Sequence, residues 1–197
     1  SSIRHLPIMA IFAMLFATSC SNPAVPDTAK ATGDQVFSPL NSGNIGTLNH
    51  IPAGRFQHNA TSTDITVISR SFYMSTHEIT TAQFVAVTGL SNPSTFFTGV
   101  VDGPVQMTSW YHALVFCNKL SMAENLQPAY TIKGSTDPDA WDGTVDSMIN
   151  IPTASNADWN AATCDWTGTG YRLPTDLEWM WAAMGAPADG QGGPTHI

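Results

Sequence analysis

The distribution of apolar and polar positions divides the chain into strand-like segments and helix-like segments. Residues 51–56 read as a strand that enters a turn and a second strand. Apolar and polar residues alternate over residues 65–74, which predicts a single strand there. A short strand is predicted over residues 129–132, while most of the stretch 122–170 reads as turns.

Two helices are predicted by polar caps that precede apolar residues at three- and four-residue steps. Thr80 and Gln83 have the spacing of a capping box, in which each side chain bonds the backbone N–H of the other residue. Gly89 is a suitable stop for this first helix. Either Thr108 or Ser109 is expected to cap the second helix.

A third helix is predicted within the segment 170–185, GYRLPTDLEWMWAAMG. Pro174 cannot continue a helix from the preceding residues, and it biases its neighbour toward extended geometry. Thr175 and Glu178 form another capping box, worth about 1 kcal/mol. Apolar residues then recur at helical spacing, and Gly185 provides a stop. The segment therefore predicts a strand end followed by a well-capped helix.

Composition indicates a folded, loop-rich domain. The 197 residues are 43% hydrophobic and only 11% charged, with six tryptophans and nine phenylalanines, which is enough to build a core. The formal net charge is −8, and no basic stripe is present to replace the counterions of a phosphate backbone. We therefore expect no nucleic-acid partner.

The N-terminal residues read as a targeting segment. The apolar run Ile8 to Ala17 is too short to span a bilayer and fits the core of a secretory signal peptide. Small residues precede Cys20, as in the lipobox of bacterial lipoproteins. Residues 1–20 are therefore predicted to be a lipoprotein-type signal peptide with Cys20 as its lipidation site. The alternative is an ordinary signal peptide that ends near a cysteine.

The expected location is the bacterial cell envelope, where a lipid anchor would hold the protein at the membrane. Residues 21–47 are rich in Pro, Ala, Thr, Ser, Gly and Asn, and they read as a flexible linker. Residues 48–197 then form the folded domain.

Few residues of this domain offer obvious chemistry. Cys117 and Cys164 match no zinc-binding spacing, and Cys117 is expected to be a buried side chain on a helix. The motifs of hydrolase nucleophiles, phosphate loops and dinucleotide sites do not occur. The acidic loop at 137–146 could hold calcium, but aspartates in turns more often bond their own backbone. A metal site between His50 and His58 is a weaker hypothesis.

The six tryptophans divide into two groups by their place in the pattern. Those on predicted helices are expected to pack in the core: Trp110, Trp179 and Trp181. Those in the loop region are candidates for stacking on a ligand, because a tryptophan ring combines a large apolar face with a polar edge: Trp141, Trp159 and Trp166.

Five sequence blocks, in the right order, resemble the formylglycine-generating enzyme family, also called sulfatase-modifying factors. The family signature R-L-P-T-E-x-E-W is similar to the segment at 172–179. The other blocks resemble the family's opening hydrophobic-P-x-G-x-F, its E-V-T-N-x-Q-F segment, its S-W-x-x-A-x-x-F-C-N helix and the stretch after that helix: residues 51–56, 72–84, 104–121 and 126–130.

This resemblance implies an α+β fold of the C-type-lectin-like type, irregular and loop-rich, and incomplete at the C-terminus. In the enzymes of the family, the later half of the domain holds the redox cysteines and calcium ligands, and a cysteine of a client sulfatase is oxidised with copper and oxygen. That half would follow Ile197, so no catalytic or metal-binding residue is carried over to this chain. We expect no cofactor here, whereas copper and calcium would belong to the complete domain.

Two functions stay open at this point. The first is an envelope lipoprotein whose sulfatase-modifying-factor domain oxidises a protein cysteine when complete but is inert in this form. The alternative is a non-enzymatic ligand-binding or display protein on a C-type-lectin-like scaffold, with a client protein or a glycan as its partner. Fold alone does not decide between them. A third reading is an unstable product that leaves apolar surface uncovered.

Overall fold

The structure is a computed structural model that describes residues 14–15, 38–59, 64–96, 99–141, 151–186 and 191–192. Its strands are β1 (Met14–Leu15), β2 (Leu40–Ser42), β3 (Gly46–Ile51), β4 (Gly54–Gln57), β5 (Ile65–Ile68), β6 (Phe72–Ser75), β7 (Tyr130–Thr131), β8 (Thr163–Cys164), β9 (Tyr171–Arg172) and β10 (Gln191–Gly192). Its helices are α1 (Thr81–Thr88), α2 (Trp110–Ala123), α3 (Ala157–Asn160), α4 (Asp176–Ala183) and a 3₁₀ turn at Pro138–Ala140.

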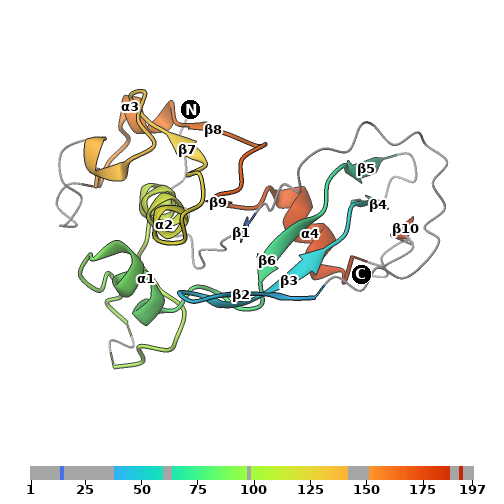
Figure 1. The fold of residues 1–197 in the computed structure, drawn as a ribbon, viewed down its shortest axis with the longest axis horizontal. Coiled ribbons are helices and arrows are strands. Elements are labelled where there is room, and N and C mark those ends of the chain that lie inside the picture. The colour runs from blue at the N-terminus through green and yellow to red at the C-terminus, as the bar shows by residue number, and fades with distance from the viewer. Residues whose placement is uncertain are drawn as a thin grey trace.

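The strands form small sheets, and the helices are distributed on either side of them. The largest sheet has five strands in the order β2-β3-β6-β1-β9, with antiparallel neighbours. A second sheet has the order β10-β4-β5, and β7 pairs with β8. Figure 1 shows α1, α2 and α3 with β7 and β8 at one end of the molecule, while β4, β5, β10 and α4 lie at the other.

The strand predicted over 65–74 is in fact two strands that belong to different sheets. β5 pairs with β4, whereas β6 pairs with β3 and β1. The three residues between them, 69–71, are all exposed, and the chain crosses there from one sheet to the other. The prediction of a single strand was therefore wrong. The alternation of apolar residues continues through residues 69–71, although the backbone of these residues pairs with no strand in the described sheets.

The fold begins earlier than the composition of the chain predicts. β2 lies within the segment 21–47 that was predicted to be a linker, and it pairs with β3 from Leu40↔Leu48 to Ser42↔Gly46. Ile45 in the connecting turn is buried, and its N–H donates to Ser42 Oγ at 3.0 Å. The linker prediction is thus wrong for residues 40–47. β1 falls within the predicted signal peptide, and residues 1–13 and 16–37 lie outside the described part of the chain.

The helix predictions are confirmed at their caps. Thr80 and Gln83 make both bonds of the capping box at the start of α1, and Gly89 ends this helix with a φ of 72°. Ser109 rather than Thr108 is the N-cap of α2. α2 is buried on nearly every side, so it acts as the central helix of the core.

Two clusters of buried side chains hold the fold together. The larger surrounds α2 and includes a stacked pair, Phe84 and Phe116, with ring centroids 5.9 Å apart. The smaller lies between β4, β5, β6 and α4, where Phe56 stacks on Trp181 at 5.4 Å. Trp181 also donates its indole N–H to the Pro52 carbonyl at 2.8 Å, which ties α4 to the turn before β4.

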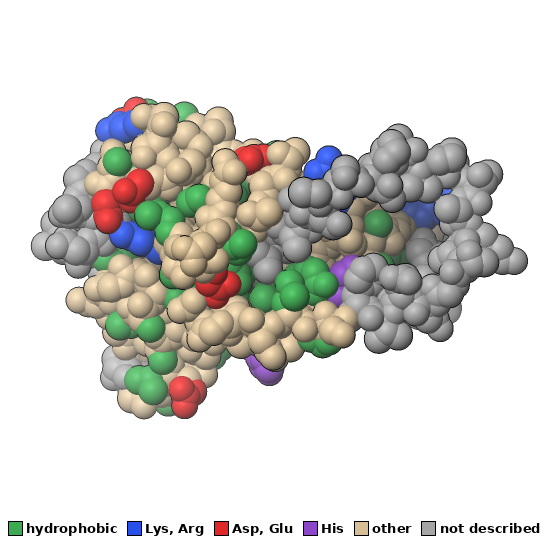
Figure 2. All heavy atoms as spheres, in the orientation of Figure 1, with side chains coloured by type: hydrophobic (Ala, Val, Ile, Leu, Met, Phe, Trp, Pro, Cys, Tyr) green, Lys and Arg blue, Asp and Glu red, His purple; other side chains and the backbone are tan. Residues whose placement is uncertain are grey.

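The surface carries few charges and no large acidic patch on the face drawn in Figure 2. Acidic side chains are scattered there over the part built by the α-helices at one end, and hydrophobic side chains reach the surface near the middle. Within the described segments, no helix is long and apolar enough to cross a membrane.

His112 makes the stability of the fold depend on pH. It is 7% exposed in the first turn of α2, where its Nδ1 accepts a bond from the Ser109 N–H at 3.1 Å. Its Nε2 is buried and has no hydrogen-bond partner among the described residues. Burial lowers the pKa of His112 from 6.5 to about 4, because a charged imidazolium would lose its hydration there.

We therefore expect the free energy of unfolding to fall as the pH drops from 6.5 to 4. In that range the unfolded chain binds a proton at His112 that the folded chain excludes, at a cost of about 3 kcal/mol over the whole range. His112→Gln keeps an acceptor for the Ser109 N–H and removes the titration. Urea titrations at several pH values should show a flatter profile for this variant. The exposed His77→Gln is the control, and an equal flattening in both variants would contradict the assignment.

Candidate functional site

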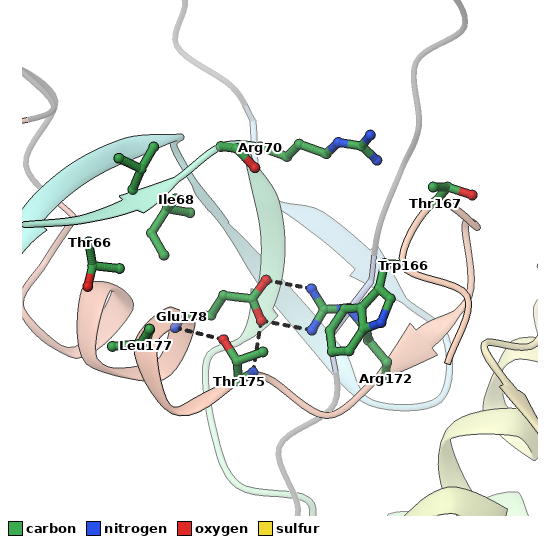
Figure 3. Close-up of a pocket in the computed structure, with 11 residues that line it drawn as sticks. Thr66, Ile68, Arg70, Trp166, Thr167, Arg172, Thr175, Leu177 and Glu178 are labelled. Atoms are coloured by element: carbon green, nitrogen blue, oxygen red, sulfur yellow. Dashed lines mark hydrogen bonds and ion pairs between the residues drawn. The ribbon is translucent and has the colours of Figure 1, made fainter. Parts of the chain in front are cut away.

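A cleft opens between β5, the N-terminal end of α4 and the loop that precedes β9. Its cavity volume is about 400 Å³. The residues that line it come from two distant segments of the chain: Thr66, Val67, Ile68, Ser69 and Arg70 from β5 and its end, and Trp166, Thr167, Arg172, Thr175, Leu177 and Glu178 from the second segment (Figure 3).

A buried ion pair forms the base of this cleft. Arg172 donates from Nη2 to Glu178 Oε1 at 2.5 Å and from Nη1 to Glu178 Oε2 at 2.8 Å. The guanidinium is 1% exposed and the carboxylate 14% exposed. Glu178 also accepts from the Thr175 N–H, so the capping box predicted from the sequence and the ion pair share one carboxylate.

The protonation of Glu178 follows from these contacts. Burial alone raises the pKa of this carboxyl group, but the bonds from Arg172 and from the Thr175 N–H outweigh it. The pKa is therefore held below its usual value. At neutral pH the two charges compensate each other, and the base of the cleft carries no net charge.

Trp166 forms a wall of the cleft. The Arg172 guanidinium carbon lies 4.6 Å from the centroid of its ring, a cation–π contact. Asp165 holds the loop in shape, because its Oδ1 accepts from both the N–H and the hydroxyl of Thr167. Trp166 is 52% exposed, so part of its ring remains open to a ligand.

The opposite wall is apolar and ends in a cation. Val67 on β5 and Leu177 on α4 are both exposed, by 67% and 37%. Arg70 extends from the end of β5 toward the loop of Trp166 and Thr167 (Figure 3). No ion pair of Arg70 is recorded among the residues that the structure describes. The cleft thus offers an open ring, an apolar wall and one available cation.

The other predicted ligand-stacking residues do not reach this cleft. Trp141 and Trp159 are buried and meet edge to face at 5.2 Å. The Trp141 indole N–H donates to the Ser135 carbonyl at 2.9 Å. Since neither ring offers an open face, the structure contradicts a stacking role for these two residues, and only Trp166 remains a candidate. The prediction that Trp179 packs in the core was also wrong, because Trp179 is 45% exposed.

The two cysteines of the domain are poor nucleophiles. Both are free: Cys117 is fully buried on α2 and Cys164 is half-buried in β8. Burial raises the pKa of Cys117 strongly and that of Cys164 to about 11. The thiolate is the reactive form, so at neutral pH both groups stay protonated and unreactive.

Side chains that commonly bind metals are scattered in the described part of the chain. No group of three or more His, Cys, Asp or Glu side chains gathers in the described part of the chain. Asp137 Oδ1 accepts from the Asp139 N–H instead, and Asp139 pairs with Lys119 at 2.7 Å. Asp142 and Asp146 of the acidic loop lie outside the described residues.

Comparison with known proteins decides the family. The profile of the sulfatase-modifying factor enzyme 1-like domain matches residues 34–192. This chain belongs to that family. The match includes β2, which agrees with a fold that begins before residue 48.

The chain is also similar to individual members and relatives. It is 37% identical over 137 residues to the chaperone protein LppX of Paenibacillus barcinonensis. The aligned residues make up 68% of this chain and 44% of that protein. The solved structure of Treponema denticola variable protein 1 superposes with a TM-score of 0.59 at 35% identity, and the match covers 75% of this chain and 56% of that one.

A third comparison supports the fold alone. The crystal structure of CarF matches with a TM-score of 0.52 at 23% identity, over 70% of this chain and 56% of that one. Together these similarities confirm the expected α+β, C-type-lectin-like fold of formylglycine-generating enzymes. This sulfatase-modifying-factor family member spans less than two thirds of the length of LppX and of each of the two solved structures.

Sequence reasoning found one side of the cleft and missed the other. The capping box and Trp166 were identified, but Arg70 and Val67 were taken as parts of an ordinary strand. The available signal was the alternation itself. Ile65 and Val67 share a face of β5, and the buried side chain is that of Ile68, so the two apolar residues face outward.

Proposed function

We propose that this protein is an envelope lipoprotein, anchored through Cys20, whose sulfatase-modifying-factor domain holds another polypeptide without oxidising it. The observation that carries the proposal is the cleft. Its wall of exposed apolar side chains, its open ring at Trp166 and its cation at Arg70 suit binding, and its described lining contains no cysteine or histidine.

The cysteines support binding over oxidation in this part of the protein. Oxidation of a client cysteine needs reactive groups that can accept electrons or hold a metal. Cys117 and Cys164 are protonated and shielded, and the described residues offer no metal ligands as a set. The relative LppX is named a chaperone protein, which also supports a binding function. A chaperone binds other proteins without changing them covalently.

A direct test measures both activities on the same preparation. The protein should suppress the aggregation of a chemically unfolded model protein in a light-scattering assay, in proportion to its concentration. Incubated with a cysteine-containing peptide, copper and oxygen, it should form no formylglycine aldehyde beyond a protein-free sample, in which copper and oxygen alone give only the disulfide. Unimpeded aggregation would refute the proposed binding, and conversion of the cysteine to an aldehyde would refute the non-enzymatic part.

A second candidate function rests on the family match. In the complete protein, a segment beyond the described residues could oxidise a client cysteine to formylglycine, and the cleft would then position the client. The chain spans 44% of the relative LppX, so the activity of the whole protein is a proposal in either case. The same peptide assay on the full-length gene product separates the two candidates, since only an oxidase would form the formylglycine aldehyde.

Lipidation at Cys20 has its own prediction. In bacteria fed radiolabelled palmitate, the protein should carry label and partition with the membrane fraction, because acyl chains buried in lipid hold it there. Cys20→Ala should lose the label and at least about 90% of the membrane association, as expected when the acyl anchor is absent. Cys164→Ala, the matched control, should keep both. Labelled Cys20→Ala protein would contradict the lipobox assignment.

A further inference from the structure

We infer that the free edge of β5 docks an extended peptide as an additional strand, with a carboxylate of that peptide bound at Arg70. This inference rests on the proposed function and specifies the chemistry of the client. It combines an open strand edge, an outward apolar face and a cation at the end of the strand.

The first observation is the open edge of β5. Among the described strands, β5 pairs only with β4, in a register from Gly54↔Ile68 to Gln57↔Ile65. In an antiparallel strand, alternate residues direct their backbone N–H and C=O groups to opposite edges. The groups that point away from β4 have no strand partner in the described part of the chain, so they can pair with an incoming strand, as in other cases of strand addition.

The second observation is the side-chain pattern of this edge strand. Edge strands are usually protected by charges, prolines or bulges. β5 has none of these along Ile65–Ile68, and it exposes Ile65 by 50% and Val67 by 67%. A peptide that added here with alternating apolar residues would cover both side chains. That burial would supply the apolar part of the binding energy.

The third observation is the charge at the end of the strand. Arg70 lies two residues after the end of β5 and lines the cleft, where the nearby Arg172 is already compensated by Glu178. A guanidinium recognises a carboxylate with two parallel hydrogen bonds. Trp166 stands across the cleft with half of its surface open, so it can cover the side chain next to the carboxylate. The client is thus an extended segment that is apolar along β5 and acidic at its end.

The probe for this site is a fluorescein-labelled peptide with an amidated C-terminus, TVTVTE, with two partners of matched size that are amidated in the same way. In TVTVTQ the carboxylate is replaced by an amide, and in TVPVTE a proline removes a backbone donor and disfavours strand pairing. Fluorescence anisotropy should show binding in the order TVTVTE, TVTVTQ, TVPVTE. Arg70→Gln should weaken TVTVTE about tenfold, as expected for one charge-assisted contact, and should leave TVTVTQ unchanged.

The control variant is Arg55→Gln. Arg55 is an exposed arginine on the neighbouring strand β4, where it lies opposite Val67 but does not line the cleft. Its replacement changes the net charge by the same amount as that of Arg70. It should leave the affinity for TVTVTE within twofold of the wild type. In the same samples, hydrogen exchange should slow at backbone amides of Ile65–Ile68 when the peptide is bound.

The outcomes separate this inference from the proposed function. Equal binding of TVTVTE and TVPVTE, or equal losses in the two arginine variants, would overturn strand docking at β5. Suppressed aggregation together with that result would leave the binding function standing. Binding of oligosaccharides but of no peptide would overturn the inference in favour of a glycan. If the backbone amides of β5 are protected from hydrogen exchange without any peptide, and analytical ultracentrifugation shows dimers, then a second copy of the chain occupies the edge and the inference is overturned.

Discussion

Gly170→Ala is expected to destabilise the protein by about 3 kcal/mol or more, because the position has no room for a side chain. A Cβ atom built there would lie 2.0 Å from the Gln127 carbonyl oxygen and 2.9 Å from Ser121 Oγ. The first contact is with backbone, which cannot rotate away. The second disturbs a buried hydroxyl that accepts from the Tyr171 N–H at 2.8 Å and donates to the Cys117 carbonyl.

This close approach connects the end of α2 to β9, so its loss should loosen the core around α2 and the base of the cleft together. Thermal melting followed by circular dichroism, with soluble yield as a second readout, would measure it. Gly43→Ala is the matched control, since nothing lies within 4 Å of a Cβ built at that position. A melting temperature for Gly170→Ala that equals that of Gly43→Ala would contradict the steric argument.

Removal of the charge of Glu178 is expected to cost about 3 kcal/mol of folding free energy. Glu178→Gln leaves the Arg172 guanidinium almost fully buried without a counter-charge, and it also weakens the bond to the Thr175 N–H. Urea titration at neutral pH gives the measurement. Asp176→Asn removes an exposed carboxylate from the same helical turn and should cost less than about 1 kcal/mol, as is usual for exposed charges.

The pH dependence of this pair has a definite sign. The pKa of Glu178 is lower in the folded chain than in the unfolded one, so the ion pair contributes fully above the unfolded value of about 4.5. Its contribution should fall as the pH drops through the folded pKa, because the carboxyl group then takes up a proton. The gap between wild type and Glu178→Gln should therefore narrow in acid. A gap that persists unchanged below this range would show that the ion pair is not its source.

The helices were predictable because their signals are local. Thr80, Ser109 and Thr175 each cap residues within one turn of themselves. The local sequence therefore indicates both that a helix forms and where it begins. The split between β5 and β6 was not predictable, since the two strands differ only in which distant strand they pair with. β2 was missed for the same reason. Its polar composition reads as linker, and its order comes from pairing with β3 and from the bond of Ser42 to Glu124.

The cleft shows the same limit at the level of the site. Arg172, Thr175 and Glu178 lie close in sequence: Thr175 and Glu178 were predicted as a capping box, and Arg172 begins the family signature, but none of them was predicted to line a site. Arg70 lies about a hundred residues earlier, and only the packing of α4 against β5 brings it to the same cavity. The tryptophans were misassigned because position in a loop does not fix exposure. Trp141, at the end of a 3₁₀ turn, and Trp159, on the short helix α3, close the core, whereas Trp179 lies on the outer side of a helix.

The burial of Cys117 gives this molecule a natural reporter of its own opening. A thiol with no exposed surface reacts with an alkylating reagent only when the surrounding helix detaches. The rate at which the Cys117 Sγ atom is labelled therefore reports how often α2 opens. In an oxidising compartment, opening of α2 would also expose the Cys117 thiol to oxidation. A mixed disulfide formed at Cys117 would then prevent the chain from refolding. The fraction of molecules lost in this way would then depend on how often α2 opens.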